Sequence, residues 1–257
     1  MRIAAFQFEA TENLELNYIK IENAIKNAAE QRIDFLLTQE CALTGYPPIE
    51  RNAISTIDFE KINKYEREII KLAIANNLGI AIGTIEKNNN SFYNTLKIID
   101  KTKKHFIYRK RALWGWDSDN FKPGTDIGIH KIENINLGFR ICYEIRFPEY
   151  FRELFISKSP ICLISFSDTS TKPNDDRYNL IIGHLQTRAV ENCIYIISAN
   201  SISNFQTAPT IVIDPNGKII TQANKNKEEI IYFDYQEKEF SFGPMGRIIH
   251  SKELLKL

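Results

Sequence analysis

The sequence predicts a single α/β domain in which helices cover the faces of β-sheets. Short apolar runs that are typical of buried strands alternate with segments of helical periodicity through most of the 257 residues. No stretch rich in Pro, Gly and Ser interrupts this alternation, so we expect one domain over residues 1–257. The hydrophobic content of 43% is ordinary for a globular protein and is sufficient for a full-sized core.

The first half of the chain contains five predicted strands and two predicted helices. The strands are apolar or alternating runs at residues 3–8, 33–38, 79–85, 93–99 and 105–110. Turn-forming residues at 86–91 (EKNNNS) and at 100–104 separate the last three of them. Each helix presents one apolar face, formed by Leu14, Tyr18, Ile21, Ile25 and Ala28 in the first helix and by Phe59, Ile62, Ile69, Ala73 and Ile74 in the second.

The second half repeats this alternation without repeating the sequence. Strands are expected at residues 137–142, 161–166 and 193–199, with helices at 148–157 and 178–191 between them. Three later β segments follow, with the turn PNG between the first two, at residues 210–213, 218–221 and 230–233. The chain therefore continues as alternating strands and helices before it closes with hairpins.

Charge and cysteine usage exclude several classes of partner and compartment. Lys and Arg number 33 against 32 Asp and Glu, so we expect neither nucleic-acid nor membrane-surface binding. No apolar run approaches the ~18 residues of a membrane span, and the amino-terminal run is too short for a signal peptide. The cysteines lack C-x-x-C spacing, which is typical of reduced thiols in the cytoplasm; they are Cys41, Cys142, Cys162 and Cys193.

Several common catalytic motifs are absent from the sequence. It contains no glycine-rich phosphate loop and no G-x-S-x-G elbow of a serine hydrolase. The four histidines are scattered without metal-ligand spacing, so no metal site is predicted. His184, on a predicted helix, is the best candidate if a cysteine were paired with a histidine.

Cys142 lies where a predicted buried strand ends, in the segment LGFRICYEIRFPEY. The carboxyl ends of strands in α/β sheets are the usual position of active sites. An inert buried thiol is the structural alternative, but such a thiol does not require ionisable neighbours. Here four of them crowd around it: Arg140, Glu144, Arg146 and Glu149.

Two further ionisable residues follow predicted strands. Glu40, in IDFLLTQECALTGYPP, either caps its loop or enters a cavity where burial would raise its pKa. Lys110, in KKHFIYRKRALWGWDSDNFKPG, shares one face of its strand with Phe106 and Tyr108 if the strand persists to that residue. A solvated basic strand edge is the alternative for Lys110.

In this order, Glu40 in LLTQE–LTGYPP, Lys110 in YRKRALW and Cys142 in CYEIRFPE resemble the Glu–Lys–Cys triad of the nitrilase-like carbon–nitrogen hydrolases. IAAFQF resembles the first strand of that family, and HLQTRAVENCIYIISAN resembles its R-A-x-E-N segment, so the likeness covers nearly the whole chain. The resemblance implies a four-layer α-β-β-α sandwich that forms homodimers or larger assemblies. It implies no metal and no organic cofactor.

The resemblance also implies a reaction, which is hydrolysis of a non-peptide C–N bond in a small linear amide through a thioester. Lys110 would favour a Cys142 thiolate and hold the oxyanion together with the backbone N–H of Tyr143. Glu40 would take the thiol proton, deliver it to the departing ammonia and then activate water.

Many family members place a second glutamate near the lysine, before an aromatic-x-x-Gly turn. The corresponding stretch here is WDSDNFKPG, so the position falls on an aspartate, which is shorter by one methylene. The spacing to Phe121 favours Asp117, and Asp119 is a close competitor. Loop solvation or an Asx turn is the alternative for either aspartate.

The substrate class is suggested by Arg146, four residues after Cys142. In the ω-amidase-like branch of the family, the arginine at this place binds a substrate carboxylate, a task that suits the guanidinium fork. An ion pair with Glu144 or Glu149 is the structural alternative. Three aromatic residues are candidates for lining the pocket, or for core or interface positions: Tyr46, Trp114 and Trp116.

Alternative functions remain at this stage. Hydrolysis of an N-carbamoyl compound is the next candidate after a linear amide, and nitrile hydrolysis ranks below it. A thioester also permits acyl transfer to an amine. The aspartate in WDSDNFKPG leaves open a catalytically impaired homologue that acts as a binding protein.

Overall fold

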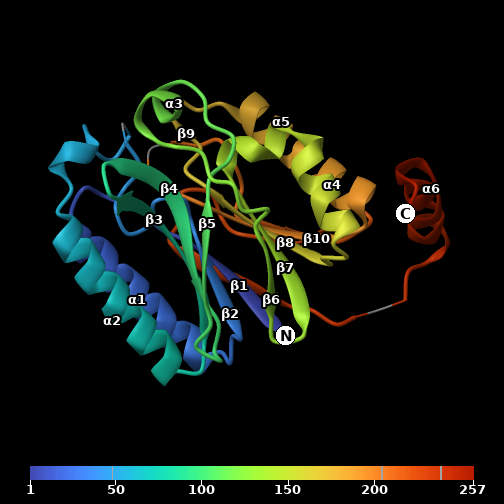
Figure 1. The fold of residues 1–257 in the computed structure, drawn as a ribbon, viewed down its shortest axis with the longest axis horizontal. Helices are drawn as coiled ribbons and strands as arrows, with labels where there is room; N and C mark the ends of the chain where they lie inside the picture. Colours follow the sequence, from blue (N-terminus) through green and yellow to red (C-terminus); the bar gives the residue numbers. More distant parts are fainter. Residues whose placement is uncertain (48, 204, 238) are drawn as a thin grey trace.

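Two six-stranded β-sheets pack face to face, and a pair of helices covers the outer face of each sheet (Figure 1). This arrangement is a computed structural model that describes residues 1–47, 49–203, 205–237 and 239–257. Pro48, in the LTGYPP segment, lies outside the described residues. The four-layer α-β-β-α sandwich expected from the sequence is confirmed.

The first sheet has the strand order β14-β1-β2-β3-β4-β5. Strands β1, β2 and β3 are parallel, and β3, β4 and β5 form an antiparallel meander. Strand β5 therefore runs in the same direction as β2, and both end at the same edge. The strands are Arg2–Gln7 (β1), Phe35–Thr38 (β2), Gly79–Asn88 (β3), Ser91–Ile99 (β4), His105–Arg109 (β5) and Glu229–Asp234 (β14).

The second sheet has the order β13-β12-β10-β8-β7-β6, with β7, β8 and β10 parallel. Two short strands, Thr169–Ser170 (β9) and Phe205–Gln206 (β11), pair separately. The six strands are Ile129–Ile132 (β6), Ile135–Ile141 (β7), Ile161–Phe166 (β8), Tyr195–Asn200 (β10), Ile211–Ile213 (β12) and Ile219–Gln222 (β13).

The helices form where the apolar spacing changes to a helical period and a polar residue caps the first turn. The Asn13 side chain accepts from two backbone N–H groups of α1, and Asn174 caps α5 in the same manner through Arg177 N–H. Helices α1 and α2 cover the first sheet, while α4 and α5 cover the second (Figure 1). Their bounds are Leu14–Glu30 (α1), Phe59–Ala75 (α2), Pro148–Ile156 (α4) and Asp175–Asn192 (α5).

Three apolar layers hold the sandwich together, one between each helix pair and its sheet and one between the two sheets. Strand β1 contributes to two of them, because Ala4 faces α1 and α2 whereas Ile3 faces the other sheet. Between the sheets, the rings of Phe35 and Phe139 lie 6.1 Å apart. Each fully buried large side chain stabilises the fold by roughly 1.5–3 kcal/mol relative to an exposed one.

The structure differs from the sequence-based prediction at several element ends. Cys193 does not begin a strand; it caps α5 with φ +54°, and β10 begins at Tyr195. The turn predicted at 86–91 shrinks to Asn89 and Asn90, because β3 and β4 extend further. Strand β6 and helices α3 (Trp116–Asn120) and α6 (Phe242–Leu255) were not predicted.

Helix α6 stands to one side of α4 and α5 (Figure 1). No helix in the part of the chain that the structure describes has the length and apolar character needed to cross a bilayer.

Candidate active site

Three residues predicted to be catalytic lie at strand ends that meet at one edge of the sandwich. Glu40 follows β2, Lys110 follows β5, and Cys142 follows β7. The two sheets are joined at this edge by a hydrogen bond of 3.2 Å from Glu40 N–H to the carbonyl of Phe166 at the end of β8. Glu40 and Lys110 are buried, and Cys142 is half-buried. The structure therefore brings the predicted set together.

The backbone before Glu40 lies directly on β3, and a glycine makes this approach possible. A Cβ added to Gly83 would lie 2.0 Å from the carbonyl oxygen of Gln39 and 2.7 Å from the nitrogen of Cys41. The Gln39 side chain donates to the carbonyl of Phe8 at 2.7 Å, which anchors the loop on the segment after β1. Glu40 is therefore held from both sides by neighbouring strands.

Lys110 bridges two buried carboxylates. Its Nζ donates to Glu40 Oε1 at 2.8 Å and to Asp117 Oδ2 at 2.6 Å. Burial lowers the pKa of Lys110, but the Coulombic attraction of Glu40 and the other nearby anions outweighs burial and holds the pKa well above its usual value. The two carboxylates therefore favour the charged form of Lys110.

Asp117, and not Asp119, meets Lys110. Helix α3 turns Asp117 inward, where it is buried and accepts a hydrogen bond of 2.8 Å from the Tyr46 hydroxyl. Asp119 is exposed. Side chains that are two residues apart on a helix point in nearly opposite directions, which explains why Asp117 is buried and Asp119 is exposed.

Sequence reasoning missed two further partners of Glu40. Asn94, on β4, donates from Nδ2 to Glu40 Oε1 at 2.7 Å, and the N–H of Ser167 donates to Glu40 Oε2 at 2.8 Å. Burial nevertheless raises the pKa of Glu40, with Lys110 opposing the shift. Glu40 is therefore a carboxylate whose proton affinity is increased, as a general base requires.

Cys142 has a strained backbone, with φ +44°, and begins a short 3₁₀ helix, η2 (Cys142–Arg146). Burial raises the pKa of its thiol well above the usual value; Glu40 adds to the increase, and Lys110 opposes it. Lys110 acts in the direction expected from the sequence, toward the thiolate, but burial and the nearby carboxylates outweigh it. Cys142 lies at the same edge as Glu40, a carboxylate whose pKa is also raised.

Glu144 fastens the nucleophile segment to the segment that carries the lysine. Its Oε2 accepts from Ile141 N–H and from the Tyr108 hydroxyl, both at 2.7 Å, and its Oε1 accepts from Arg111 N–H at 2.6 Å. Tyr108 and Arg111 flank Lys110, so Glu144 fixes the spacing between Lys110 and Cys142.

Tyr143 is the second residue of η2. The first N–H groups of a helix have no partner within the helix. The role of the Tyr143 backbone N–H as a donor to an oxyanion stays a prediction.

Arg146 lies at the end of η2 and contacts α5. Its Nη1 is 3.0 Å from His184 Nε2, and its carbonyl accepts from Arg188 Nη2 at 3.3 Å. Burial and the Arg146 charge lower the pKa of His184, so the ring is a neutral acceptor. Across the described ranges, no carboxylate lies within 4.0 Å of the Arg146 guanidinium, and the ion pairs with Glu144 and Glu149 are not formed.

The three aromatic candidates occupy different environments. Tyr46 is half-buried beside Lys110, and its ring centroid lies 5.9 Å from Lys110 Nζ. Trp116 packs edge-on against Phe121 in the core beneath α1 and α2, whereas Trp114 is 75% exposed.

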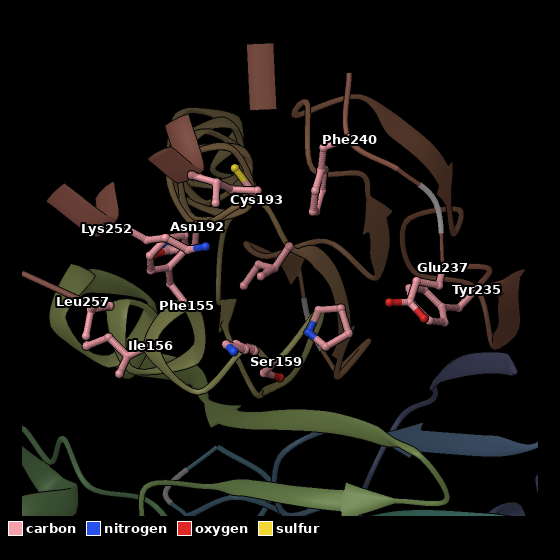
Figure 2. A pocket seen from close by; sticks show the side chains of 14 residues that line it. Phe155, Ile156, Ser159, Asn192, Cys193, Tyr235, Glu237, Phe240, Lys252 and Leu257 are labelled. Atoms are coloured by element: carbon pink, nitrogen blue, oxygen red, sulfur yellow. The ribbon is translucent and has the colours of Figure 1, made fainter. Parts of the chain in front are cut away.

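A separate cavity of about 530 Å³ lies between α4, the end of α5 and the carboxyl-terminal segment (Figure 2). Cys193 and Asn192 line it, but none of the predicted site residues does. Among the described residues, no group of His, Cys, Asp and Glu is arranged to hold a metal ion.

Comparisons with known proteins show what this chain is similar to. Residues 2–240 match the family model described as carbon-nitrogen hydrolase. The deaminated glutathione amidase of Dictyostelium discoideum is 27% identical over 91% of this chain and 87% of its own length. The 2-oxoglutaramate amidase of Bacillus subtilis is 24% identical over 88% of this chain and 87% of its own.

A solved structure shares the fold. It is a variant of the amidase from Nesterenkonia sp. AN1 that carries the acetamide moiety of fluoroacetamide covalently on its active-site cysteine. The TM-score is 0.84 at 20% identity, covering 100% of this chain and 95% of that chain.

Proposed function

Because the chain belongs to the carbon–nitrogen hydrolase family and is an amide hydrolase, we propose that it cleaves a small linear amide bearing a carboxylate, through a thioester on Cys142. The observation that carries this proposal is the Lys110 bridge between Glu40 and Asp117, at the same edge as the end of β7. The bridge supports the proposal, because it would provide a base and a cation for a sulfur nucleophile at the end of β7.

Acylation begins when the Cys142 sulfur attacks the amide carbon while Glu40 takes the thiol proton. The oxyanion that forms is stabilised by Lys110 Nζ and by the Tyr143 N–H, and one such donor contributes roughly 10²–10³ in rate. Glu40 then gives the proton to the nitrogen as the C–N bond breaks, and ammonia leaves. A base with a raised proton affinity suits both proton transfers.

Deacylation uses the same groups with water as the nucleophile. Glu40 takes a proton from water, which attacks the thioester carbon, and the second oxyanion occupies the same position beside Lys110. Collapse of this intermediate breaks the C–S bond, returns the proton to the sulfur and releases a carboxylic acid. Asp117 holds Lys110 in place through both steps and lies 2.6 Å from it.

The carboxylate of the substrate is assigned to Arg146. Its guanidinium has a neutral histidine as its side-chain partner, at 3.0 Å, instead of an acidic residue. His184 thereby orients the fork without compensating its charge. An anionic group on the substrate would provide the missing counter-charge, with a charge-assisted pair of hydrogen bonds.

Intact-protein mass spectrometry together with an ammonia assay tests the proposed reaction. The protein is mixed with ω-amides of small acids, N-carbamoyl acids, simple nitriles and hydroxylamine as an alternative acceptor. An acyl adduct on Cys142 with ammonia release from the ω-amides is expected. Ammonia from an ω-amide that still appears after Cys142→Ala would contradict the thioester.

Replacing Arg146 by alanine is expected to raise KM for acidic amides by about tenfold to a hundredfold, because a charge-assisted hydrogen bond contributes roughly 1.5–3 kcal/mol. The KM for a neutral amide of equal length should change little, and Arg146→Lys should lie in between because it keeps the charge but loses the fork. Steady-state kinetics on the matched substrates measures this; equal effects on both substrates would refute the assignment.

A further inference from the structure

A second ion pair lies beside the Glu40 contact, outside the set of residues predicted from the sequence. Asp168 directly follows Ser167, whose N–H donates to Glu40 Oε2. Asp168 is buried, and its carboxylate accepts from Arg177 Nε at 2.8 Å and from Arg177 Nη2 at 2.6 Å. The Thr207 hydroxyl also donates to it.

The backbone of Asp168 is fixed as firmly as its side chain. Its N–H donates to Asn200 Oδ1 at 2.9 Å, and its carbonyl accepts from Asn200 Nδ2 at 2.9 Å and from Thr207 N–H at 3.0 Å. Every polar group of Asp168 therefore has a partner. The orientation of the preceding Ser167 N–H, and with it the Glu40 carboxylate, follows from this network.

Arg177 occupies an unfavourable place for a cation. It is the third residue of α5, within the first turn, where the helix dipole favours negative charge. Its side chain remains 44% exposed, yet two of its nitrogens are committed to Asp168. Without Arg177, Asp168 would be a buried carboxylate with no counter-ion near the nucleophile, which is costly.

The charge of the pair acts on Cys142 together with the other ionisable groups of the site. Asp168 raises the pKa of the Cys142 thiol, in the same direction as Glu40 and Asp117. The ionisable groups whose charges interact with Cys142 include Glu40, Tyr46, Lys110, Asp117, Asp168 and Arg177.

We propose that Arg177 and Asp168 are positioning residues of this active site. Asp168 holds the Ser167 N–H on Glu40, and Arg177 both orients Asp168 and cancels its charge next to Cys142. This inference rests on the proposed roles of Glu40 and Cys142. It predicts that removing the Arg177 charge and removing the Asp168 charge change the reactivity of Cys142 in opposite directions. If the pair were purely structural, both changes would shift that reactivity in the same direction.

A charge cycle tests the proposal through the rate of Cys142 alkylation by iodoacetamide between pH 7 and 10, at low ionic strength. Arg177→Gln leaves the Asp168 charge uncompensated, so the rate at fixed pH should fall by about threefold or more. Asp168→Asn leaves the Arg177 cation in place, so the rate should rise by a similar factor. In the double variant, the alkylation rate should return close to that of the unmodified protein.

Matched controls separate this effect from general damage. Arg2 and Asp234 form an exposed pair with the same two-nitrogen geometry between β1 and β14, so Arg2→Gln and Asp234→Asn should leave the alkylation profile unchanged. Alkylation of Cys142→Ala gives the background from the other thiols. Shifts of the same sign in both single variants would overturn the inference.

Kinetics with the substrate supply a second readout. A positioning role predicts that Arg177→Gln lowers kcat, with partial rescue by Arg177→Lys. An increase in KM for acidic amides alone, with an unchanged alkylation profile, would instead make Arg177 a substrate contact and overturn the proposal. If Cys142→Ala retained turnover, the proposed function itself would fail, and that result is distinct from either outcome.

Discussion

Replacing Cys142 by alanine is expected to abolish ammonia release, with a loss on the order of 10⁴ to 10⁶ in kcat, because removal of a nucleophile eliminates the covalent route. The fold should persist. Alanine fills the half-buried site with the loss of one sulfur atom, and a loss of about 1 kcal/mol in the free energy of unfolding is expected. Ammonia release and urea unfolding of the same preparation measure the two quantities.

The remaining cysteines provide matched controls for this prediction. Cys41 is buried next to Glu40, Cys162 lies within β8, and Cys193 ends α5. Alanine at Cys162 or Cys193 should preserve kcat per folded molecule. Cys41→Ala is the most demanding control, because that residue has φ +51° and adjoins the base. Loss of turnover confined to one of these three variants would remove Cys142 as the nucleophile.

Replacing Lys110 by methionine is expected to reduce both kcat and stability. The oxyanion loses one donor, which costs roughly 10²–10³ in kcat. Glu40 and Asp117 are left buried without their cation, and breaking a buried pair in this way costs about 3–5 kcal/mol. One of the two carboxyl groups should then take up a proton on folding at neutral pH. Urea unfolding between pH 5 and 8 measures the stability change.

Two further variants separate the effect of Lys110 on kcat from its effect on stability. Adding Asp117→Asn to Lys110→Met removes one uncompensated anion, so stability should recover in part while kcat stays low. Lys97 pairs with the buried Glu66, away from the strand ends, so Lys97→Met should lower stability without lowering kcat per folded molecule. Recovery of kcat in the double variant would contradict a direct role for Lys110.

Residues on regular strands were predictable because periodicity fixes which way they point. Alternation placed Lys110 on the same face as Tyr108, and both are buried, whereas Ile107 is exposed. Cys142 and Glu40 follow strands that were predicted from short apolar runs. These strands belong to different sheets, and the face-to-face packing of the two sheets brings their ends to one edge. The positions of Glu40, Lys110 and Cys142 could therefore be predicted from strand periodicity together with the family resemblance.

The missed features depend on contacts between distant segments. Asn94 shares its face of β4 with Leu96 and Ile98, so a polar residue on an apolar face was the available sign of a functional contact. Ser167 contributes through its backbone N–H, which leaves no trace in the side-chain pattern. Helix α6 was missed because Gly243, Pro244 and Gly246 weaken its sequence pattern, although proline is tolerated in a first turn.

The pairing of β1 with β14 has a consequence for how the protein folds. Arg2 lies opposite Asp234, so one of the earliest strands cannot complete its hydrogen bonds until a strand more than 200 residues later is available. Until then, the unpaired backbone N–H and C=O groups along this edge of β1 can form hydrogen bonds with other chains. Such distant contacts slow folding. Refolding should therefore be slow and sensitive to protein concentration, and a chaperone that shields the open edge should improve the yield of native protein.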